Sequence, residues 1–305
     1  MPPKKKRKRS FEDSAFVTVM KETHQHEGVR LALIKKLEDF LSAKVVSYFT
    51  SFGNKDAQIN NRDAEMLESM LSSEPTDKKI VLFLSSPGGQ GMAAERIVDV
   101  FRAYSKNRFE VMVPHMAKSA ATMICFGSSL IHMSETAELG PVDPQVPYWS
   151  KDEDEEPDWI SAEEYVRSYD KLVKAASDGK AKRLEPFIQQ LARYDDRFIE
   201  KLRSAQKLSE DISIRLLKSS MMKTKTSAQI RKCIDVFLTQ TRTSSHGRMI
   251  NHEEAVECGL AVKLIDLHSQ LWHTMWELYV RSEWCVNNRC AKLLETSNTS
   301  VSAGK

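Results

Sequence analysis

Two strand-length apolar runs in this chain each end in a turn of small residues, and each is followed by a helix-forming segment. The first reads KKIVLFLSSPGGQGMAAERIVDVFRAY over residues 78–104, and the second reads FEVMVPHMAKSAATMICFG over residues 109–127. A continuous apolar run of this length is typical of a strand buried on both faces, as in a parallel sheet covered by helices. The alternation of such strands with helices predicts an α/β fold.

The two turns carry the residue types that a catalytic site needs. Ligands of parallel sheets bind at the carboxyl ends of the strands, so we expect Gly88, Gly89 and Ser119 on one edge of the sheet. Glycines leave their N–H groups unshielded, and such donors hold a developing oxyanion. Ser119 opens a helix, where the macrodipole favours negative charge, and the N–H of Ala120 is the natural second donor. The structural alternative is that Ser119 is a helix N-cap and the glycine pair a tight turn.

The chain divides by composition into a folded core and two polar ends. Its 305 residues are enough for one or two domains. We expect a disordered basic N-terminal tail over residues 1–30, a serine-peptidase-like domain over 31–284, and a disordered C-terminal tail over 285–305. Within the domain, the acidic segment at about 150–158 is predicted to be a loop, and residues 161–240 are predicted to be a helical insertion.

The composition gives no indication of a cofactor. Five scattered cysteines without a C-x-x-C pair indicate reduced thiols and no structural zinc site, and the eight histidines show no recurrent ligand spacing. No phosphate-binding loop of the Walker type is present. We therefore expect no metal, no bound cofactor and no ATP coupling within the chain.

The basic run Lys4–Arg9 holds nearly all of the net charge of +3. It resembles a nuclear localisation signal, and two other interpretations are a nucleic-acid-binding arm and a leader of recombinant origin. No apolar stretch is long enough for a membrane helix or a signal peptide. The sequence thus predicts a soluble intracellular protein, cytoplasmic or, if the basic run is a signal, nuclear.

Four segments together resemble a known family. They are SSPGG, VPHMAKSAATM, LIHMSETAELGPVDPQ and HGRMINHEEAVECGL, and they fall within about residues 45–280. They are similar to the serine dehydrogenase proteinase family of the Clp protease/crotonase superfamily, which includes signal peptide peptidase A-like serine peptidases. The resemblance implies stacked ββα units with additional helices, a homo-oligomer, a peptide or protein substrate, and Ser119 as nucleophile. It also implies an oxyanion hole made of the Gly88–Gly89 turn and Ala120.

The general base is the open question of this resemblance, because a serine hydroxyl is a weak nucleophile without one. For a Ser-Lys dyad the matching segment EEPDWISAEEY holds no lysine; Lys151 lies in the acidic run, and Lys118 is expected to point away from its neighbour. For a triad, His246 lies within one residue of the place where the Clp subunit carries its aspartate, and Asp143 lies where that subunit carries its histidine. We therefore predict an exchanged pair, His246 as base and Asp143 as its orienting carboxylate. The alternative is that both are ordinary loop residues.

Three functions fit these observations. The first is an ATP-independent serine endopeptidase that acts through an acyl-enzyme on Ser119. The second is a crotonase-type acyl-CoA enzyme, which also uses paired backbone N–H groups. The third is a catalytically degenerate scaffold or interaction protein that keeps the fold and has lost its base.

Overall fold

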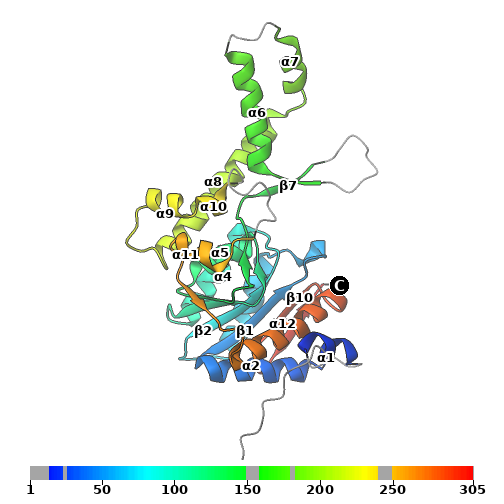
Figure 1. Ribbon diagram of the computed structural model, residues 1–305, viewed down its shortest axis with the longest axis vertical. Coiled ribbons are helices and arrows are strands. Elements are labelled where there is room, and N and C mark those ends of the chain that lie inside the picture. Colours follow the sequence, from blue (N-terminus) through cyan, green and yellow to red (C-terminus); the bar gives the residue numbers. More distant parts are fainter. Residues whose placement is uncertain (1–13, 23–25, 149–157, 179–182, 240–248, 305) are drawn as a thin grey trace, which may run out of the picture.

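A central seven-stranded sheet forms the core of the protein (Figure 1). The computed structural model describes residues 14–22, 26–148, 158–178, 183–239 and 249–304. The strand order is β11-β10-β1-β2-β3-β5-β9, parallel from β1 to β9, with an antiparallel edge formed by β10 and β11. The strands are β1 (Lys44–Thr50), β2 (Ile80–Ser85), β3 (Phe109–Val113), β5 (Ile131–Met133), β9 (Val262–Leu264), β10 (Lys292–Glu295) and β11 (Ser300–Ala303). The α/β prediction is confirmed.

Helices cover both faces of this sheet. Every residue of β2 is buried, with Leu82 in the cluster of one face and Phe83 in that of the other. This two-sided burial explains why the strand reads as an unbroken apolar run. On the Leu82 side lie α3 (Asn61–Ser73), α4 (Gly91–Tyr104) and α5 (Ala120–Gly127). On the Phe83 side lie α1 (Ala15–Lys21), α2 (Glu27–Leu41) and α12 (Gln270–Asn288).

Two small strand pairs lie beyond the carboxyl edge of the central sheet. The second apolar run, which begins FEVMVPHM, breaks after Val113, so that β4 (Met116–Ala117) leaves the main sheet and pairs in parallel with β6 (Glu138–Leu139). A hairpin of β7 (Gln145–Tyr148) and β8 (Asp158–Ser161) follows. Most of the predicted acidic loop lies between these two strands, outside the described residues.

The described helices between residues 162 and 238 form an arm and a bridge back to the sheet. α6 (Ala162–Ser177) and α7 (Glu185–Leu191) stand away from the sheet in Figure 1. α8 (Asp196–Lys218) packs Phe198 against Tyr165 of α6 at one end and buries Ile212 in the main core at the other. The short helices α9 (Ser227–Cys233), α10 (Asp235–Leu238) and α11 (His252–Glu257) follow α8 along the chain.

The C-terminal prediction is wrong, because residues 285–304 are not a disordered tail. α12 continues to Asn288, and β10 and β11 form the antiparallel edge. Lys292 makes a buried ion pair with Asp63 of α3 at 2.8 Å, and Glu295 accepts three hydrogen bonds from Arg30 of α2. Lys292 and Glu295 have partners more than two hundred positions away in the sequence. The polar composition of the segment alone therefore gave no sign that it is folded.

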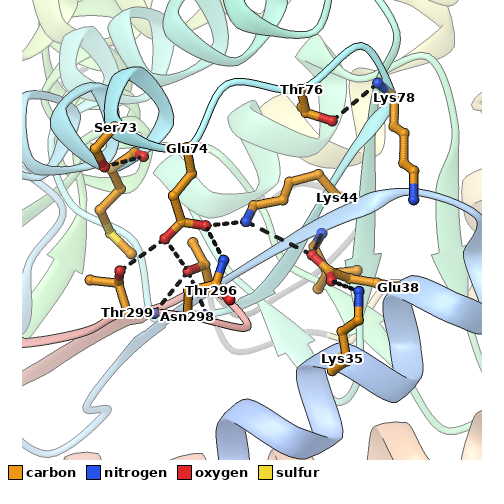
Figure 2. Close-up of polar contacts among 12 residues, drawn as sticks. Lys35, Glu38, Lys44, Ser73, Glu74, Thr76, Lys78, Thr296, Asn298 and Thr299 are labelled. Carbon is orange, nitrogen blue, oxygen red and sulfur yellow. Dashed lines mark hydrogen bonds and ion pairs between the residues drawn. The ribbon is translucent and has the colours of Figure 1, made fainter.

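A polar network around Glu74 closes the turn between β10 and β11 (Figure 2). Its carboxylate accepts hydrogen bonds from Thr296 and Thr299 at 2.8 Å and from Asn298 at 3.0 Å, and it also pairs with Lys44. Burial opposes the charge on Glu74, but these hydrogen bonds outweigh it and lower the pKa of this carboxyl to about 2. The turn is therefore held by an ionised carboxylate.

The N-terminal prediction is corrected in part. Residues 14–22 and 26–30 are described, and most of them are helical: Ser14 caps α1, and Glu22 pairs with buried Arg281 of α12 at 2.7 Å. The basic run Lys4–Arg9 lies outside the described residues. Within the described ranges, no helix has the length and apolar character needed to cross a membrane.

Candidate active site

The two turns singled out in the sequence lie against each other at the carboxyl edge of the sheet. Beyond β2, Ser86 pairs with Ala117: its N–H donates to Met116 at 3.3 Å, and its carbonyl accepts from the Lys118 N–H at 3.0 Å. Gly88 then approaches the second turn so closely that a Cβ on it would lie 2.7 Å from the Ser119 Cβ. With φ at +107°, Gly88 also has a backbone conformation that other residues rarely adopt. Only glycine fits this contact.

Ser119 has a strained backbone. Its φ of 49° and ψ of −119° lie outside the regions that an L-residue prefers, and it sits at the sharp start of α5. Its side chain makes no capping hydrogen bond to the helix, so the role of an ordinary N-cap does not account for it. A serine held in such a turn between strand and helix is typical of an exposed nucleophile, because the strain persists only where the surroundings impose it.

Some backbone groups of the two turns form hydrogen bonds within the protein, and others have no partner among the described residues. The Gly88 N–H donates to Ser86 Oγ at 3.1 Å, and the Gly88 carbonyl accepts from the Ile59 N–H at 2.9 Å. Gly89 lies so near Ile59 that a Cβ would be 2.4 Å from the Ile59 nitrogen. Among the described residues, neither the Gly89 N–H nor the Ala120 N–H has a hydrogen-bond partner. These two donors remain for a ligand.

A loop after β6 packs directly on the serine turn. The Ser119 N–H donates to Pro141 at 3.1 Å, and the buried hydroxyl of Thr122 donates to Gly140 at 2.9 Å. Asp143 follows in this loop with an exposed fraction of 3%. The structure thus places Asp143 two residues beyond a carbonyl bonded to Ser119.

His246 lies outside the described residues, but both ends of its segment are placed. On one side the Val142 N–H donates to Phe237 at 2.8 Å, and on the other Ile250 and Leu139 exchange two backbone hydrogen bonds at 2.9 and 3.0 Å. Phe237 and Ile250, the described residues on either side of His246, are therefore bonded to Val142 and to Leu139, one and four residues before Asp143.

A cavity of about 540 Å³ opens in front of Ser119. Its walls are the loop 52–55, the turn 87–90, the pair Pro144–Gln145, and Trp159 of β8. Among the described residues that line it, Lys55 is the one with an ionisable side chain. Sequence reasoning missed Lys55 and Trp159; the signal for Lys55 was its place just after β1, on the same edge as the two turns.

The other candidate bases do not face this cavity. Lys118 pairs with Glu138 of β6, and its side chain packs against Gly140. His115 packs its ring on Tyr279 of α12 and bonds the Tyr279 hydroxyl at 3.2 Å; burial lowers the pKa of this histidine. Lys151 lies outside the described residues. No cluster of three or more metal-ligating side chains occurs in the described part of the chain.

Comparison with known proteins supports the resemblance seen in the sequence. Residues 28–152, less than half of the chain, match the model of the ClpP-like SDH-type serine proteinases. The uncharacterized protein MJ0137 of Methanocaldococcus jannaschii is 30% identical over 141 residues, 43% of this chain and 49% of that protein. The uncharacterized protein MJ1495 of the same organism is 28% identical over 130 residues, 42% of this chain and 41% of that protein. The chain thus matches less than half the length of either relative.

Among solved structures, a variant of the 1510-N membrane-bound stomatin-specific protease is similar at 16% identity. The alignment covers 68% of this chain and 75% of that one, with a TM-score of 0.35.

Proposed function

We propose that the protein is an ATP-independent serine endopeptidase, because residues 28–152 match the model of the ClpP-like SDH-type serine proteinases. The observation that carries the proposal is the strained Ser119, which lines a cavity together with Gly89 and directly precedes Ala120; within the described ranges, the N–H groups of Gly89 and Ala120 have no partner. The family match supports a serine peptidase in general. The residue roles below are our own assignment.

In the proposed reaction, Ser119 Oγ attacks the carbonyl carbon of a peptide bond, and its proton passes to a base. The carbonyl oxygen becomes an oxyanion that accepts hydrogen bonds from the N–H groups of Gly89 and Ala120. The base then protonates the leaving amine, and the acyl group stays on Ser119. Water, deprotonated by the same base, then attacks the acyl carbonyl carbon, and Ser119 leaves as the protonated hydroxyl. The Gly88 N–H, already bonded to Ser86, shapes the turn and does not stabilise the oxyanion.

His246 is the proposed base, and Asp143 the carboxylate that orients it. The support is topological: Phe237 and Ile250, which flank the stretch that contains His246, are hydrogen-bonded to Val142 and Leu139, close in sequence to buried Asp143. His246 is four residues from Ile250 in the sequence, so the two residues lie at most roughly 14 Å apart. Lys55 is the competing base because it lines the cavity.

Fluorophosphonate labelling with mass-spectrometric mapping tests this assignment. We expect one adduct, on Ser119, absent in Ser119→Ala and reduced at least ten-fold in His246→Ala and Asp143→Asn. Lys55→Ala serves as the comparison: labelling lost there and kept in His246→Ala would transfer the role of base to Lys55. Ser129→Ala, a serine outside the cavity, is the matched control and should label normally.

One observation favours a second candidate, the catalytically degenerate scaffold. Among the described residues, no histidine or carboxylate lines the cavity in front of Ser119. If folded protein gives no adduct and no turnover of casein or of a peptide library, the scaffold is the better assignment. A peptide or protein substrate, a homo-oligomer and targeting by Lys4–Arg9 also stay proposals. Light scattering tests the oligomeric state. The cellular localisation of a variant that lacks Lys4–Arg9 tests the targeting.

A further inference from the structure

The cavity in front of Ser119 shares a wall with a second cavity, and the shared wall is the loop that follows β1. The second cavity has a volume of about 730 Å³, and residues 286–290, where α12 ends, line it as well. Gly53, Asn54 and Lys55 line both cavities. A peptide that extends from Ser119 across this loop therefore enters the second cavity.

These two cavities carry charge of one sign. Among the described residues that line them, the side chains charged at neutral pH are those of Lys55 and Arg289, and no aspartate or glutamate is present. The chain as a whole has nearly equal numbers, 45 lysines and arginines against 42 aspartates and glutamates. Three further cavities follow this balance, because each of them is lined by cations and carboxylates together. The lack of carboxylates thus distinguishes the described surface next to Ser119.

Local structure positions both cations. Lys55 begins the short 3-10 helix η2 (Lys55–Ala57), and the side chain of the preceding Asn54 caps this helix by accepting a backbone N–H at 2.8 Å. The guanidinium of Arg289 lies over the Trp284 ring, 5.0 Å from its centre. Both cationic residues are exposed at the surface. An ammonium acts as a point charge and a guanidinium as a planar fork of N–H groups, and both forms bind carboxylates.

We propose that the groove formed by the two cavities and their shared loop 53–55 selects acidic peptides, with Lys55 and Arg289 as the residues that determine this specificity. A surface lined by one sign of charge attracts the opposite sign and rejects its own. The inference rests on the proposed function, which makes a peptide the occupant of the groove. The carboxylates belong to aspartate and glutamate side chains or to a free C-terminus, and the test separates these two sources.

This role differs from the role of general base considered above for Lys55. A base takes the Ser119 proton, so its loss slows the reaction with every substrate and reagent, charged or uncharged. A cation that determines specificity changes the binding of charged ligands relative to uncharged ones. The comparison of charged with uncharged ligands therefore separates the two roles.

Fluorescence anisotropy with the full-length Ser119→Ala protein tests the proposal without turnover. Peptides of one sequence carry Glu, Gln or Lys at the same positions, with blocked termini and an uncharged dye. We expect the Glu peptide to bind roughly ten-fold tighter than the Gln peptide, and the Lys peptide to bind most weakly. The ratio should fall as salt is added, because exposed charges are screened. The Gln peptide with a free C-terminus shows whether a terminal carboxylate binds as well as a side-chain carboxylate.

Charge variants in the same Ser119→Ala protein sharpen the test. Lys55→Gln and Arg289→Gln should each reduce the preference for the Glu peptide about three-fold. Lys55→Glu combined with Arg289→Glu should reverse the preference, so that the Lys peptide binds best. Lys232→Glu, at an exposed lysine of α9 outside both cavities, is the matched control and should keep the preference. Circular dichroism of each variant separates a changed preference from a loss of fold.

Three results would overturn the proposal: equal affinities for the Glu, Gln and Lys peptides, no measurable affinity for any of them, or a preference that survives the double charge reversal. Fluorophosphonate labelling of protein that retains Ser119 tests the proposed function separately. Labelling without a charge preference keeps the peptidase and removes its acidic specificity. A charge preference without labelling removes the peptidase and leaves a groove that binds acidic peptides. Loss of labelling in Lys55→Gln with an unchanged preference would assign Lys55 to the proton transfer instead.

Discussion

The serine edge of the sheet and its C-terminal edge are built by opposite means. Around Ser119, backbone groups bond to one another, two glycines take conformations closed to other residues, and Ser119 itself is strained. Around β10, charged side chains bond to one another: Lys292 with Asp63, Glu295 with Arg30, and the turn with Glu74. The first edge stores strain where chemistry is expected, and the second supplies interactions that hold the sheet together. This contrast predicts that mutations will separate activity from stability.

The largest effect is expected at Ser119. Ser119→Gly should abolish fluorophosphonate labelling and lower any peptidase turnover by roughly 10⁴-fold or more. The same change should raise the free energy of unfolding by about 1 kcal/mol, because glycine adopts a positive φ without strain. Urea denaturation and labelling in parallel measure the two effects. Ser269→Gly, at the regular N-cap of α12, is the control and should lose a few tenths of a kcal/mol. A lower free energy of unfolding in Ser119→Gly would contradict the claim that the Ser119 backbone is strained.

The next largest effect is expected at Lys292, on the other edge. Lys292→Met leaves the Asp63 carboxylate buried without its cation, which should cost about 3–5 kcal/mol of unfolding free energy. Tyr48, which donates to Asp63 at 2.8 Å, cannot replace a charge. Adding Asp63→Asn should recover part of the loss. Lys35→Met, at a lysine side chain 60% exposed, should change stability by less than about 1 kcal/mol. Equal effects at the two lysines would refute the buried pair.

A substitution at Gly88 is expected to lower both stability and the reactivity of Ser119. Gly88→Ala would place a Cβ 2.6 Å from the Lys118 carbonyl oxygen and 2.7 Å from the Ser119 Cβ, at a φ that alanine avoids. We expect a loss of roughly 2–4 kcal/mol in stability together with the loss of Ser119 labelling. Gly53→Ala, where a Cβ meets nothing within 4 Å, is the matched glycine control on the cavity wall. Normal labelling of Ser119 in Gly88→Ala would show that the space between Gly88 and Ser119 can accept a Cβ, against this expectation.

The smallest effect concerns pH and Glu74. Folding lowers the pKa of this carboxyl from 4.5 to about 2, so its stabilisation is complete above pH 4.5 and is lost as the pH falls toward 2. After allowance for solvent screening, the contribution is about 1–2 kcal/mol. Glu74→Gln should flatten this part of the stability profile in urea titrations at successive pH values. Glu68→Gln, at an exposed position of α3, the helix that ends just before Glu74, should leave the profile unchanged.

The sequence predicted the serine edge because its signals are local. Unbroken apolar runs identify β2 and β3, and the residues after each run identify Gly88 and Ser119 without knowledge of their neighbours. The strand break at Pro114 was not predicted, since it depends on the pairing of Met116 with Glu138.

The C-terminal edge was mispredicted because its signals are distant. Glu295 reads as a solvated residue until Arg30, 265 positions earlier, is placed beside it. Lys55 was missed for a similar reason, since its role as a cavity wall depends on how a loop folds. His246 and Asp143 stay predictions: the structure places Asp143 and both ends of the His246 segment, and the described residues do not include His246.

The long helix α8 makes the arm and the proposed site mechanically continuous. A helix of 23 residues is a rod of about 35 Å. Its outer end packs against α6, and past its midpoint the buried Ser209 hydroxyl donates to the Val142 carbonyl, one residue before Asp143. A single continuous helix therefore contacts both the arm and the loop that carries Asp143.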